Sequence, residues 1–309
     1  MRAGWVLAGV LGLAAVAVPC ALGQSSSRFM PLDSGFGPLN PAPPSVPVKQ
    51  LIREFVAKET QFSEAMTNYT WVRTAKVEAL NSDDKPKGEY YEVDAVGKHS
   101  HGRRVEQVLF APPSTLMNAN VMMSESDFQD IDHRMPFVLT AQQIGEYNVT
   151  YVGRQKVDQV ETYVFDVAPK RIVKGYRYFD GRIWVDQRDH QIVVTDGKSV
   201  PDDLKRGQED LSLPFITFYQ QVDGKYWFPA WTHGAGWLHF EGGSGYLSEN
   251  VHMTETITYT KYKRFGSRVT LIFDGKKLKN PGKAGAKSGQ PGQSSGQSSG
   301  EGQPQNPKQ

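Results

Sequence analysis

The feature that most constrains the fold of this chain is an alternation of apolar and polar residues that runs, with interruptions, from Tyr69 to Phe265. Successive side chains of a β-strand point to opposite faces, so alternation is typical of strands with one buried face. The first alternating segment places five apolar residues on one face: Tyr69, Trp71, Ala75, Val77 and Ala79. We therefore expect most of the chain to form an antiparallel sheet.

Further segments repeat this pattern and are separated by residues that favour turns. The predicted strands include residues 91–95, 105–110, 147–151, 163–167, 218–222, 226–228 and 251–265. The predicted turns lie at residues 83–88, at Gly97, Gly153 and Asp158, and at the pairs Asp180-Gly181 and Asp223-Gly224. An Asp-Gly pair between two apolar runs is a strong hairpin signal, and Asp223-Gly224 is the clearest case.

One amphipathic helix is predicted ahead of the strands, from Val48 to about Met66. Its apolar residues recur at intervals of three and four, which places them on one stripe: Val48, Leu51, Ile52, Phe55, Val56, Phe62 and Met66. Such a stripe needs an apolar partner surface, and the sheet supplies it. Because large sheets twist and curl, the predicted fold is α+β and mostly β, with this helix packed on a strongly curved antiparallel sheet.

The first residues, Met1 to Gly23, have the features of a secretory signal peptide. An apolar stretch from Trp5 to Val18 is followed by small residues that favour cleavage before Gln24. A retained membrane anchor is the weaker alternative, because this stretch is shorter than the ~20 residues that a spanning helix needs. We expect a periplasmic or secreted protein with no transmembrane segment in the mature chain.

The predicted mature chain contains no cysteine, because Cys20 is the sole cysteine and lies in the signal peptide. Disulfides and thiolate metal sites are thereby excluded, so stability must come from burial and from backbone hydrogen bonds. The charges nearly balance, with 35 Lys and Arg against 33 Asp and Glu. This balance argues against a nucleic acid partner.

Segments rich in Pro, Ser and Gly flank the alternating region. Residues 24–47 contain several prolines and a run of three serines, and are expected to be a disordered linker. Residues 274–309 consist mainly of Gly, Ser, Gln, Pro and Lys, and are expected to be a disordered tail. This tail either contacts anionic lipid or cell-wall polymer or is a soluble spacer. Residues 48–273 are expected to form one β-rich domain.

A family resemblance rests on two runs in the middle of the chain, from Tyr178 to Asp186 and from Gln191 to Gly197. In the first run a strand ends in an aromatic residue, an apolar residue and an aspartate, and a turn and a second strand follow. Together with the N-terminal helix and the strand meander, these runs resemble the superfamily of periplasmic outer-membrane lipoprotein-sorting carriers. The resemblance covers residues 48–273. It implies an unclosed β-barrel whose concave side accepts acyl chains or an apolar peptide, and it implies no catalytic site.

A long connection between predicted strands, residues 111–146, is a candidate lid over a ligand cavity. Its apolar residues are scattered without alternation, and four of them are methionines, whose flexible side chains adapt to ligands of varied shape. Two short helices are expected in it, after Ser124 and from Thr140 to Glu146. The residues expected to line the apolar cavity and lid are Trp71, Tyr91, Tyr151, Phe165, Ile183, Met117, Met122 and Met123. The open alternative is that the methionines are core filler beneath a long loop.

The histidines do not form a convincing metal or catalytic pattern. His99 and His101 would share one face of a strand, but Arg103 and Arg104 adjoin them and the sequence fixes no third ligand. Asp132-His133-Arg134 has no identifiable nucleophile beside it. We expect no metal, no cofactor and no catalytic residue. A hydrolase assembled from distant residues, including His133 or His239, is the least favoured alternative.

Four aspartates near predicted turns could be imagined as calcium ligands or as a glycosidase pair. They are Asp180, Asp186, Asp189 and Asp196. Calcium needs six or more oxygens that converge on one point, whereas aspartates beside turns usually accept hydrogen bonds from nearby backbone N–H groups. We therefore expect them to cap turns.

Two functional hypotheses follow. The first is the binding or carriage of an apolar ligand, either lipid acyl chains or a lipoprotein, in a cavity between the curved sheet and the helix. The second is a non-enzymatic envelope module that holds a protein or a glycan through exposed aromatic residues such as Trp227, Trp231 and Trp237. The second hypothesis predicts a core that the protein's own side chains fill.

Overall fold

The computed structural model describes residues 35–98, 104–121, 123, 138–201, 213–240 and 249–265, and the short segments 272–273 and 276–277. Its helical elements are α1 (Val48–Met66) and the short 3-10 helices η1 (Leu116–Ala119) and η2 (Ile144–Glu146). The strands of the main sheet are β1 (Tyr69–Leu80), β2 (Pro86–Lys98), β3 (Arg104–Phe110), β4 (Tyr147–Val157), β5 (Val160–Pro169), β6 (Tyr178–Asp186), β7 (Ile192–Val200), β8 (Phe215–Val222), β9 (Tyr226–Phe240) and β10 (Glu249–Arg264).

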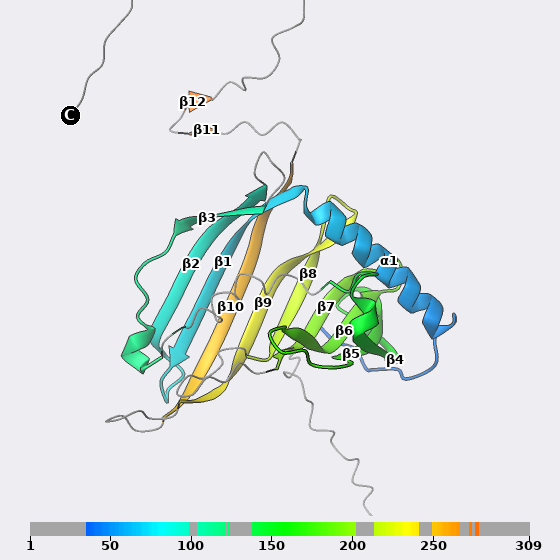
Figure 1. Cartoon of the computed structure of the whole chain (residues 1–309), viewed down its shortest axis with the longest axis horizontal. Coiled ribbons are helices and arrows are strands. Elements are labelled where there is room, and N and C mark those ends of the chain that lie inside the picture. Colours follow the sequence, from blue (N-terminus) through cyan, green and yellow to red (C-terminus); the bar gives the residue numbers. More distant parts are fainter. Residues whose placement is uncertain are drawn as a thin grey trace, which may run out of the picture. The chain divides into compact units, whose positions relative to one another are not determined.

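These ten strands form one antiparallel sheet in the order β3-β2-β1-β10-β9-β8-β7-β6-β5-β4 (Figure 1). The sheet is curved. It is not closed, because the first and last strands in this order, β3 and β4, do not pair with each other. The expected α+β fold with an unclosed antiparallel sheet is confirmed. Because β3 and β4 follow each other in the chain but lie at opposite edges, the connection between them must cross the width of the sheet.

Residues 268–309 form a separate unit. Within it the structure describes a two-stranded ladder of β11 (Ile272–Phe273) and β12 (Lys276–Lys277). β12 falls inside the segment predicted to be a disordered tail, and the remainder of that segment lies outside the described residues.

The predicted helix is confirmed as α1, and its apolar stripe faces the sheet. Leu51, Phe55, Val56 and Phe62 are buried, and Glu59 is buried with them. Figure 1 shows α1 lying across the β4–β8 end of the sheet, with β1, β2 and β3 beyond it. We call the face of the sheet that packs against α1 the inner face.

Two of the predicted turns are confirmed as hairpin turns. Asp223 and Gly224 join β8 to β9 with positive φ angles of 53° and 62°. Two consecutive left-handed residues form the turn whose twist matches that of paired strands, which is why an Asp-Gly pair occurs there. Asp158, with φ of 50°, lies between β4 and β5.

The predicted turn at Asp180-Gly181 is wrong, because both residues lie within β6, where Gly181 pairs with Gly197 of β7. A methyl group at Gly181 would lie 2.6 Å from the Phe179 ring, so the two glycines make room for that ring across the strands. Gly97 and Gly153 likewise lie within β2 and β4. At Gly153 a methyl group would lie 2.5 Å from the Asn40 carbonyl oxygen, so this glycine allows a close backbone approach and does not mark a turn.

Residues 35–47, part of the predicted linker, make contacts with the sheet. Phe36 and Asn40 form backbone bridges to Val157 and Arg154 of β4. The Phe36 ring packs edge-on against Trp184, with 5.3 Å between ring centroids. This segment therefore covers the edge of β4 and part of the outer face, which composition alone did not indicate.

In the part of the chain that the structure describes, no helix combines the length and apolar character that a bilayer crossing requires.

Candidate functional site

The inner face of the sheet has two halves that differ in what covers them. In the helix-covered half, α1 packs on inward side chains of β4 to β8; its buried residues include Leu51, Phe55, Val56, Leu139, Tyr163, Phe165, Ile183, Ile192, Phe215 and Tyr219. In the loop-covered half, inward side chains of β1, β2, β9 and β10 pack mainly against residues of irregular segments. The covering residues there are Leu116, Ala119, Val121 and Leu213, together with Phe62 from the end of α1.

Aromatic rings fill the contact between α1 and the sheet. Phe55 packs against Phe165 with 5.3 Å between centroids, and Tyr151 packs against the same ring at 5.7 Å. Near the end of the helix, Phe62 meets Phe228 of β9 edge-on at 5.0 Å. At these points the protein's own side chains occupy the space directly beneath the helix.

The floor of the loop-covered half includes two small residues, Ala79 and Gly236, among larger ones such as Trp71 and Tyr259. Ala79 of β1, Met253 of β10 and Gly236 of β9 form one row across three strands, since Met253 pairs with both of its neighbours. A methyl group at Gly236 would lie 3.2 Å from Cδ2 of Leu213, so the Leu213 side chain rests on this floor. We call Leu116, Val121 and Leu213 the plug residues. They fill space above the small floor positions that larger side chains of the sheet would otherwise fill.

The connection that carries Leu116 and Val121 is hydrogen-bonded to β2. The Thr115 N–H donates to the Glu89 carbonyl at 2.8 Å, and the Glu89 N–H donates to Thr115 Oγ1 at 2.9 Å. A methyl group at Gly88 would lie 2.5 Å from the Thr115 carbonyl oxygen, so this glycine lets the connection approach β2 closely. The connection predicted to be a lid is therefore partly core, because Leu116 and Val121 are buried.

A buried ion pair lies on the inner face of the loop-covered half. Arg73 and Asp94 are each 1% exposed, and Arg73 Nη2 lies 2.7 Å from Asp94 Oδ2. Glu106 of β3 approaches the same guanidinium at 3.6 Å and is one-third exposed. Glu255 of β10 is buried on this face too, opposite Val77. Sequence reasoning missed this group, although its signal is visible as an arginine at an inward position between Trp71 and Ala75.

The helix-covered half contains a buried carboxyl group, that of Glu59. Its Oε1 accepts a hydrogen bond of 3.0 Å from the Ile192 N–H, and the residue is 2% exposed. Burial raises the pKa of Glu59 to about 8, although the bond from Ile192 partly opposes this. Burial also raises the pKa of Tyr219, and the nearby Glu59 adds to that rise. Sequence reasoning missed Glu59 as well; it lies on the apolar stripe, three residues from both Val56 and Phe62.

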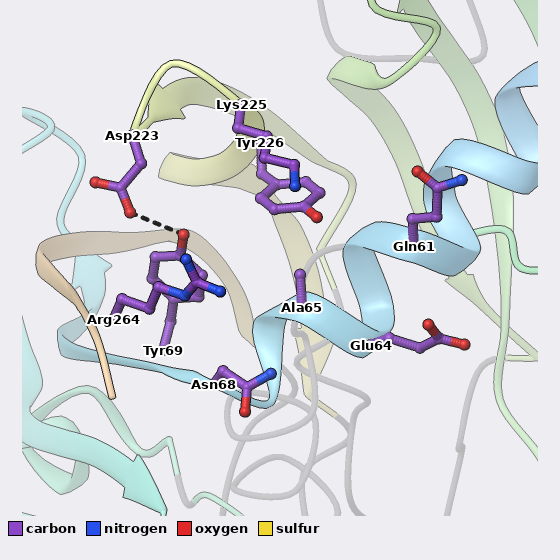
Figure 2. A pocket seen from close by; sticks show the side chains of 9 residues that line it. All are labelled: Gln61, Glu64, Ala65, Asn68, Tyr69, Asp223, Lys225, Tyr226 and Arg264. Atoms are coloured by element: carbon purple, nitrogen blue, oxygen red, sulfur yellow. Dashed lines mark hydrogen bonds between the residues drawn. The ribbon is translucent and has the colours of Figure 1, made fainter. Parts of the chain in front are cut away.

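A pocket of about 400 Å³ lies at the rim of the inner face, where α1 ends (Figure 2). We call it the rim pocket. It is lined by Gln61, Glu64, Ala65, Asn68, Tyr69, Asp223, Lys225, Tyr226 and Arg264. These residues come from the last turns of α1, the start of β1, the β8–β9 hairpin and the end of β10. No local pattern predicted this pocket, because three separate parts of the chain build it.

The rim pocket combines aromatic rings with charges of both signs. The Tyr69 hydroxyl donates a 2.8 Å hydrogen bond to Asp223 Oδ2, and Lys225 Nζ lies 5.0 Å from the centroid of the Tyr226 ring. Burial, and next the bond to Asp223, raise the pKa of Tyr69 to about 12. Tyr69 therefore stays protonated at neutral pH, and its hydroxyl fixes the orientation of the Asp223 carboxylate.

The outer face of the sheet has a strip of aromatic and histidine rings. Trp231 stacks on Phe218 and His233, with centroids 5.9 and 5.4 Å apart. Trp237 stacks on His252 at 4.8 Å and is 67% exposed. These two tryptophans lie on one strand, β9. Trp227, the third one named there, is half-buried, and its Nε1–H donates to Asp189 Oδ2 at 3.2 Å.

The structure does not bring the predicted cavity residues together at one place. Trp71 is buried in the loop-covered half, whereas Phe165 and Ile183 are buried in the helix-covered half. Tyr151 is half-buried near them, and its hydroxyl donates to the Ala42 carbonyl at 3.0 Å. Tyr91 lies on the outer face, because its neighbour Tyr90 is the residue that packs inward.

The three predicted lid methionines also differ in position. Met117 is 60% exposed, and Met123 is half-buried against the core of the loop-covered half. Met122 lies outside the described residues, as does the helix predicted after Ser124. The helix predicted from Thr140 to Glu146 is reduced to the single 3-10 turn of η2. Contact of any of these residues with a ligand stays a prediction.

The aspartates are turn caps in part. Asp186 Oδ1 accepts a 2.9 Å bond from the Arg188 N–H in the β6–β7 turn, as expected. Asp180 and Asp196 instead lie within β6 and β7, since that pairing runs through the predicted turn. His99, His101 and His133 lie outside the described residues, and His239 contacts Asn250 at 2.8 Å. Among the described residues, no three His, Cys, Asp or Glu side chains are placed to hold a metal ion.

Comparison with known proteins gives a weak likeness to a solved structure. No family model matches the chain, and no curated protein matches it. A solved domain from Vibrio parahaemolyticus, described as an outer membrane lipoprotein-sorting protein, aligns with 71% of this chain and 94% of its own length. The TM-score is 0.31 and the sequence identity 10%, so the likeness is a weak one at the level of the fold.

Proposed function

We propose that this protein is a non-enzymatic carrier of an apolar ligand, such as the acyl chains of a lipid or lipoprotein, and that it acts outside the cytoplasm after loss of its signal peptide. The ligand binds in the loop-covered half of the inner face. The observation that carries the proposal is the floor of small residues at Ala79 and Gly236, on which Leu213 of an irregular segment rests.

A hydrocarbon chain can replace the plug residues without breaking the sheet. Leu116, Val121 and Leu213 belong neither to the ladder of the main sheet nor to α1. Each methylene that enters the space they leave gains about 0.8 kcal/mol, so a few methylenes offset the exposure of one leucine. In the helix-covered half, by contrast, a ligand would have to separate Phe55 from Phe165 and lift a regular helix.

The test compares two leucine truncations in the full mature chain. Leu213→Ala removes a plug side chain, and Leu139→Ala removes a leucine of the same size from the helix-covered half, where it is fully buried. We expect Leu213→Ala to bind a fluorescent fatty acid several-fold more tightly than the unaltered protein, because the ligand no longer displaces that side chain. Leu139→Ala should leave the affinity unchanged.

Two results would contradict the carrier proposal. One is equal affinity for the two variants and the unaltered protein, which would place any binding elsewhere. The other is a protein that arrives free of ligand in native mass spectrometry after mild extraction and also takes up no fatty acid.

A second candidate function, attachment to an envelope glycan or protein, is favoured by the outer-face strip. Trp231 and Trp237 lie six residues apart on one face of β9, a separation of roughly 20 Å along a strand. Trp237 in particular leaves most of its ring in contact with solvent. If this strip is the functional surface, Trp237→Ala will weaken retention on isolated cell-envelope material while Leu213→Ala will not.

A further inference from the structure

We propose that the rim pocket binds a small zwitterionic group, in which an ammonium and an anionic group such as phosphate are joined by a short linker. This inference stands apart from the carrier proposal, since it uses none of the plug residues. Its chemistry occurs both in free phosphoethanolamine and in the head group of an ethanolamine lipid.

The pocket has the size and the polarity for such a group. Its volume of about 400 Å³ falls within the usual range for small-molecule sites, roughly 300–1,000 Å³. Its polar side chains come from three well-separated parts of the chain, and they include the amides of Gln61 and Asn68 (Figure 2). A purely apolar ligand would leave these groups without hydrogen bonds, which disfavours the acyl chain itself as the occupant.

The charges of the lining select a ligand that carries both signs. The lining contains two cations, Lys225 and Arg264, and two carboxylates, Glu64 and Asp223. A simple anion would meet repulsion from the carboxylates, and a simple cation would meet repulsion from Lys225 and Arg264. A zwitterion places one of its groups beside each kind of charge.

The arrangement of these side chains also gives the ligand a direction. In Figure 2, Asp223 and Arg264 lie on one side of the pocket and Glu64 of α1 lies on the other. Asp223 is already held by the Tyr69 hydroxyl at 2.8 Å. Glu64 is therefore the carboxylate we assign to the ammonium of the ligand. The C-terminal end of α1, which closes at Met66 beside this pocket, adds a partial negative charge that favours an ammonium there. The anionic end then faces Lys225 and Arg264.

The floor of the pocket connects it to the apolar interior. Tyr69 and Tyr226, which line the pocket, also pack with the core of the loop-covered half. The Tyr69 ring lies 4.7 Å from that of Phe228 in this core. The head group of a lipid could thus occupy the pocket at the rim of the same half in which we place acyl chains.

The experiment is a calorimetric titration of the mature chain with phosphoethanolamine, and in parallel with ethanolamine and inorganic phosphate. We expect measurable binding of phosphoethanolamine and at least tenfold weaker binding of each fragment, because each fragment carries charge of one sign. Glu64→Gln and Lys225→Gln should each weaken phosphoethanolamine binding about tenfold, because each removes one matched charge. Lys58→Gln, a change at an exposed position of α1 outside the pocket, is the control and should have no effect.

Vesicles of phosphatidylethanolamine and of phosphatidylglycerol distinguish the two sources of the group. Binding that depends on Glu64 and Lys225 but occurs only with phosphatidylethanolamine vesicles assigns the site to a lipid head group; binding of free phosphoethanolamine assigns it to the soluble molecule. The inference is overturned if phosphate alone binds as tightly, if neither source binds, or if Glu64→Gln and Lys225→Gln behave like the control. Fatty acid uptake by Glu64→Gln should remain normal, so failure here leaves the carrier proposal untouched.

Discussion

The two halves of the inner face are covered in different ways. In the helix-covered half, a regular helix meets the sheet through large aromatic rings such as Phe55 and Phe165. In the loop-covered half, the floor has small residues at Ala79 and Gly236, and the cover comes mainly from segments outside α1 and the sheet, which include Leu116 and Leu213. A helix makes its own backbone hydrogen bonds, whereas the irregular cover is tied to β2 through Thr115. The difference indicates which half can open at moderate cost.

The halves also differ in how they accommodate buried charge. Arg73 and Asp94 neutralise each other in the loop-covered half. Glu59 in the helix-covered half has a backbone N–H as its bonded partner, and its raised pKa keeps it uncharged at and below neutral pH. Since Glu59 carries a proton at neutral pH that it loses as the pH rises through about 8, we expect the stability of the helix-covered half to depend on pH.

The largest effect that we expect comes from the aromatic contact beneath α1. Phe55→Ala should lower the free energy of unfolding by about 3–5 kcal/mol, because a fully buried ring leaves a cavity that a regular helix cannot collapse to fill. Urea unfolding followed by circular dichroism measures this. Uptake of a fluorescent fatty acid should not increase in the surviving folded protein. An increase in uptake as large as that of Leu213→Ala would remove the distinction between the halves.

A change at Glu59 should separate the halves by their response to pH. The pKa of its carboxyl is raised from 4.5 to about 8 in the folded protein, so the unfolded chain loses its proton first as pH rises. The free energy of unfolding should therefore fall between about pH 4.5 and pH 8, and level off above that, at most by about 1.4 kcal/mol per pH unit. Glu59→Gln keeps an acceptor for the Ile192 N–H and should abolish this fall.

The measurement is a series of urea titrations from pH 4 to pH 9 on the unaltered protein and on Glu59→Gln. The two should be close in stability at pH 4, and the variant should be the more stable at pH 9. Glu161→Gln, at an exposed position of β5, is the control and should follow the unaltered protein. Parallel pH curves for all three proteins would show that Glu59 is not the titrating group.

A smaller effect is expected where the irregular cover touches β2. Gly88→Ala places a methyl group 2.5 Å from the Thr115 carbonyl oxygen and 2.8 Å from the Leu116 Cα, so the connection must move away. We expect a loss of about 1–3 kcal/mol in stability, together with higher fatty acid uptake. Gly145→Ala, where a methyl group meets no atom within 4 Å, should change neither quantity. A stability loss without any gain in uptake would mean that the cover does not gate this half.

Local pattern was sufficient to predict most of the elements. Apolar residues that recur at intervals of three and four predicted α1 from Val48 to Met66. The alternation of apolar and polar residues predicted the final strand close to its observed limits, Glu249 and Arg264. Asp223-Gly224 identified its hairpin because a two-residue turn is determined by its own residues. Each of these features depends on neighbours in the sequence.

Features that depend on distant residues were not predictable in the same way. Gly181 lies in a strand because Gly197 and the Phe179 ring lie against it, and no local signal distinguishes that from a turn. Tyr91 points outward because Asp94, three residues later, must meet Arg73 on the inner face. The rim pocket corresponds to no local sequence pattern, since its walls come from three separate segments.

The strand order has a consequence for when the proposed ligand site forms during folding. Most neighbouring strands are joined by short hairpins, but β1 and β10 pair although Tyr69 and Arg264, which are partners, stand at opposite ends of the domain sequence. Pairing β1 with β10, which we call the seam, closes the longest loop of the sheet and has the largest entropy cost. We therefore expect this pairing to form late in folding. Ala79 lies on one side of the seam and Met253 on the other. A partly folded chain in which this seam has not yet formed therefore lacks the floor on which we propose that the ligand binds.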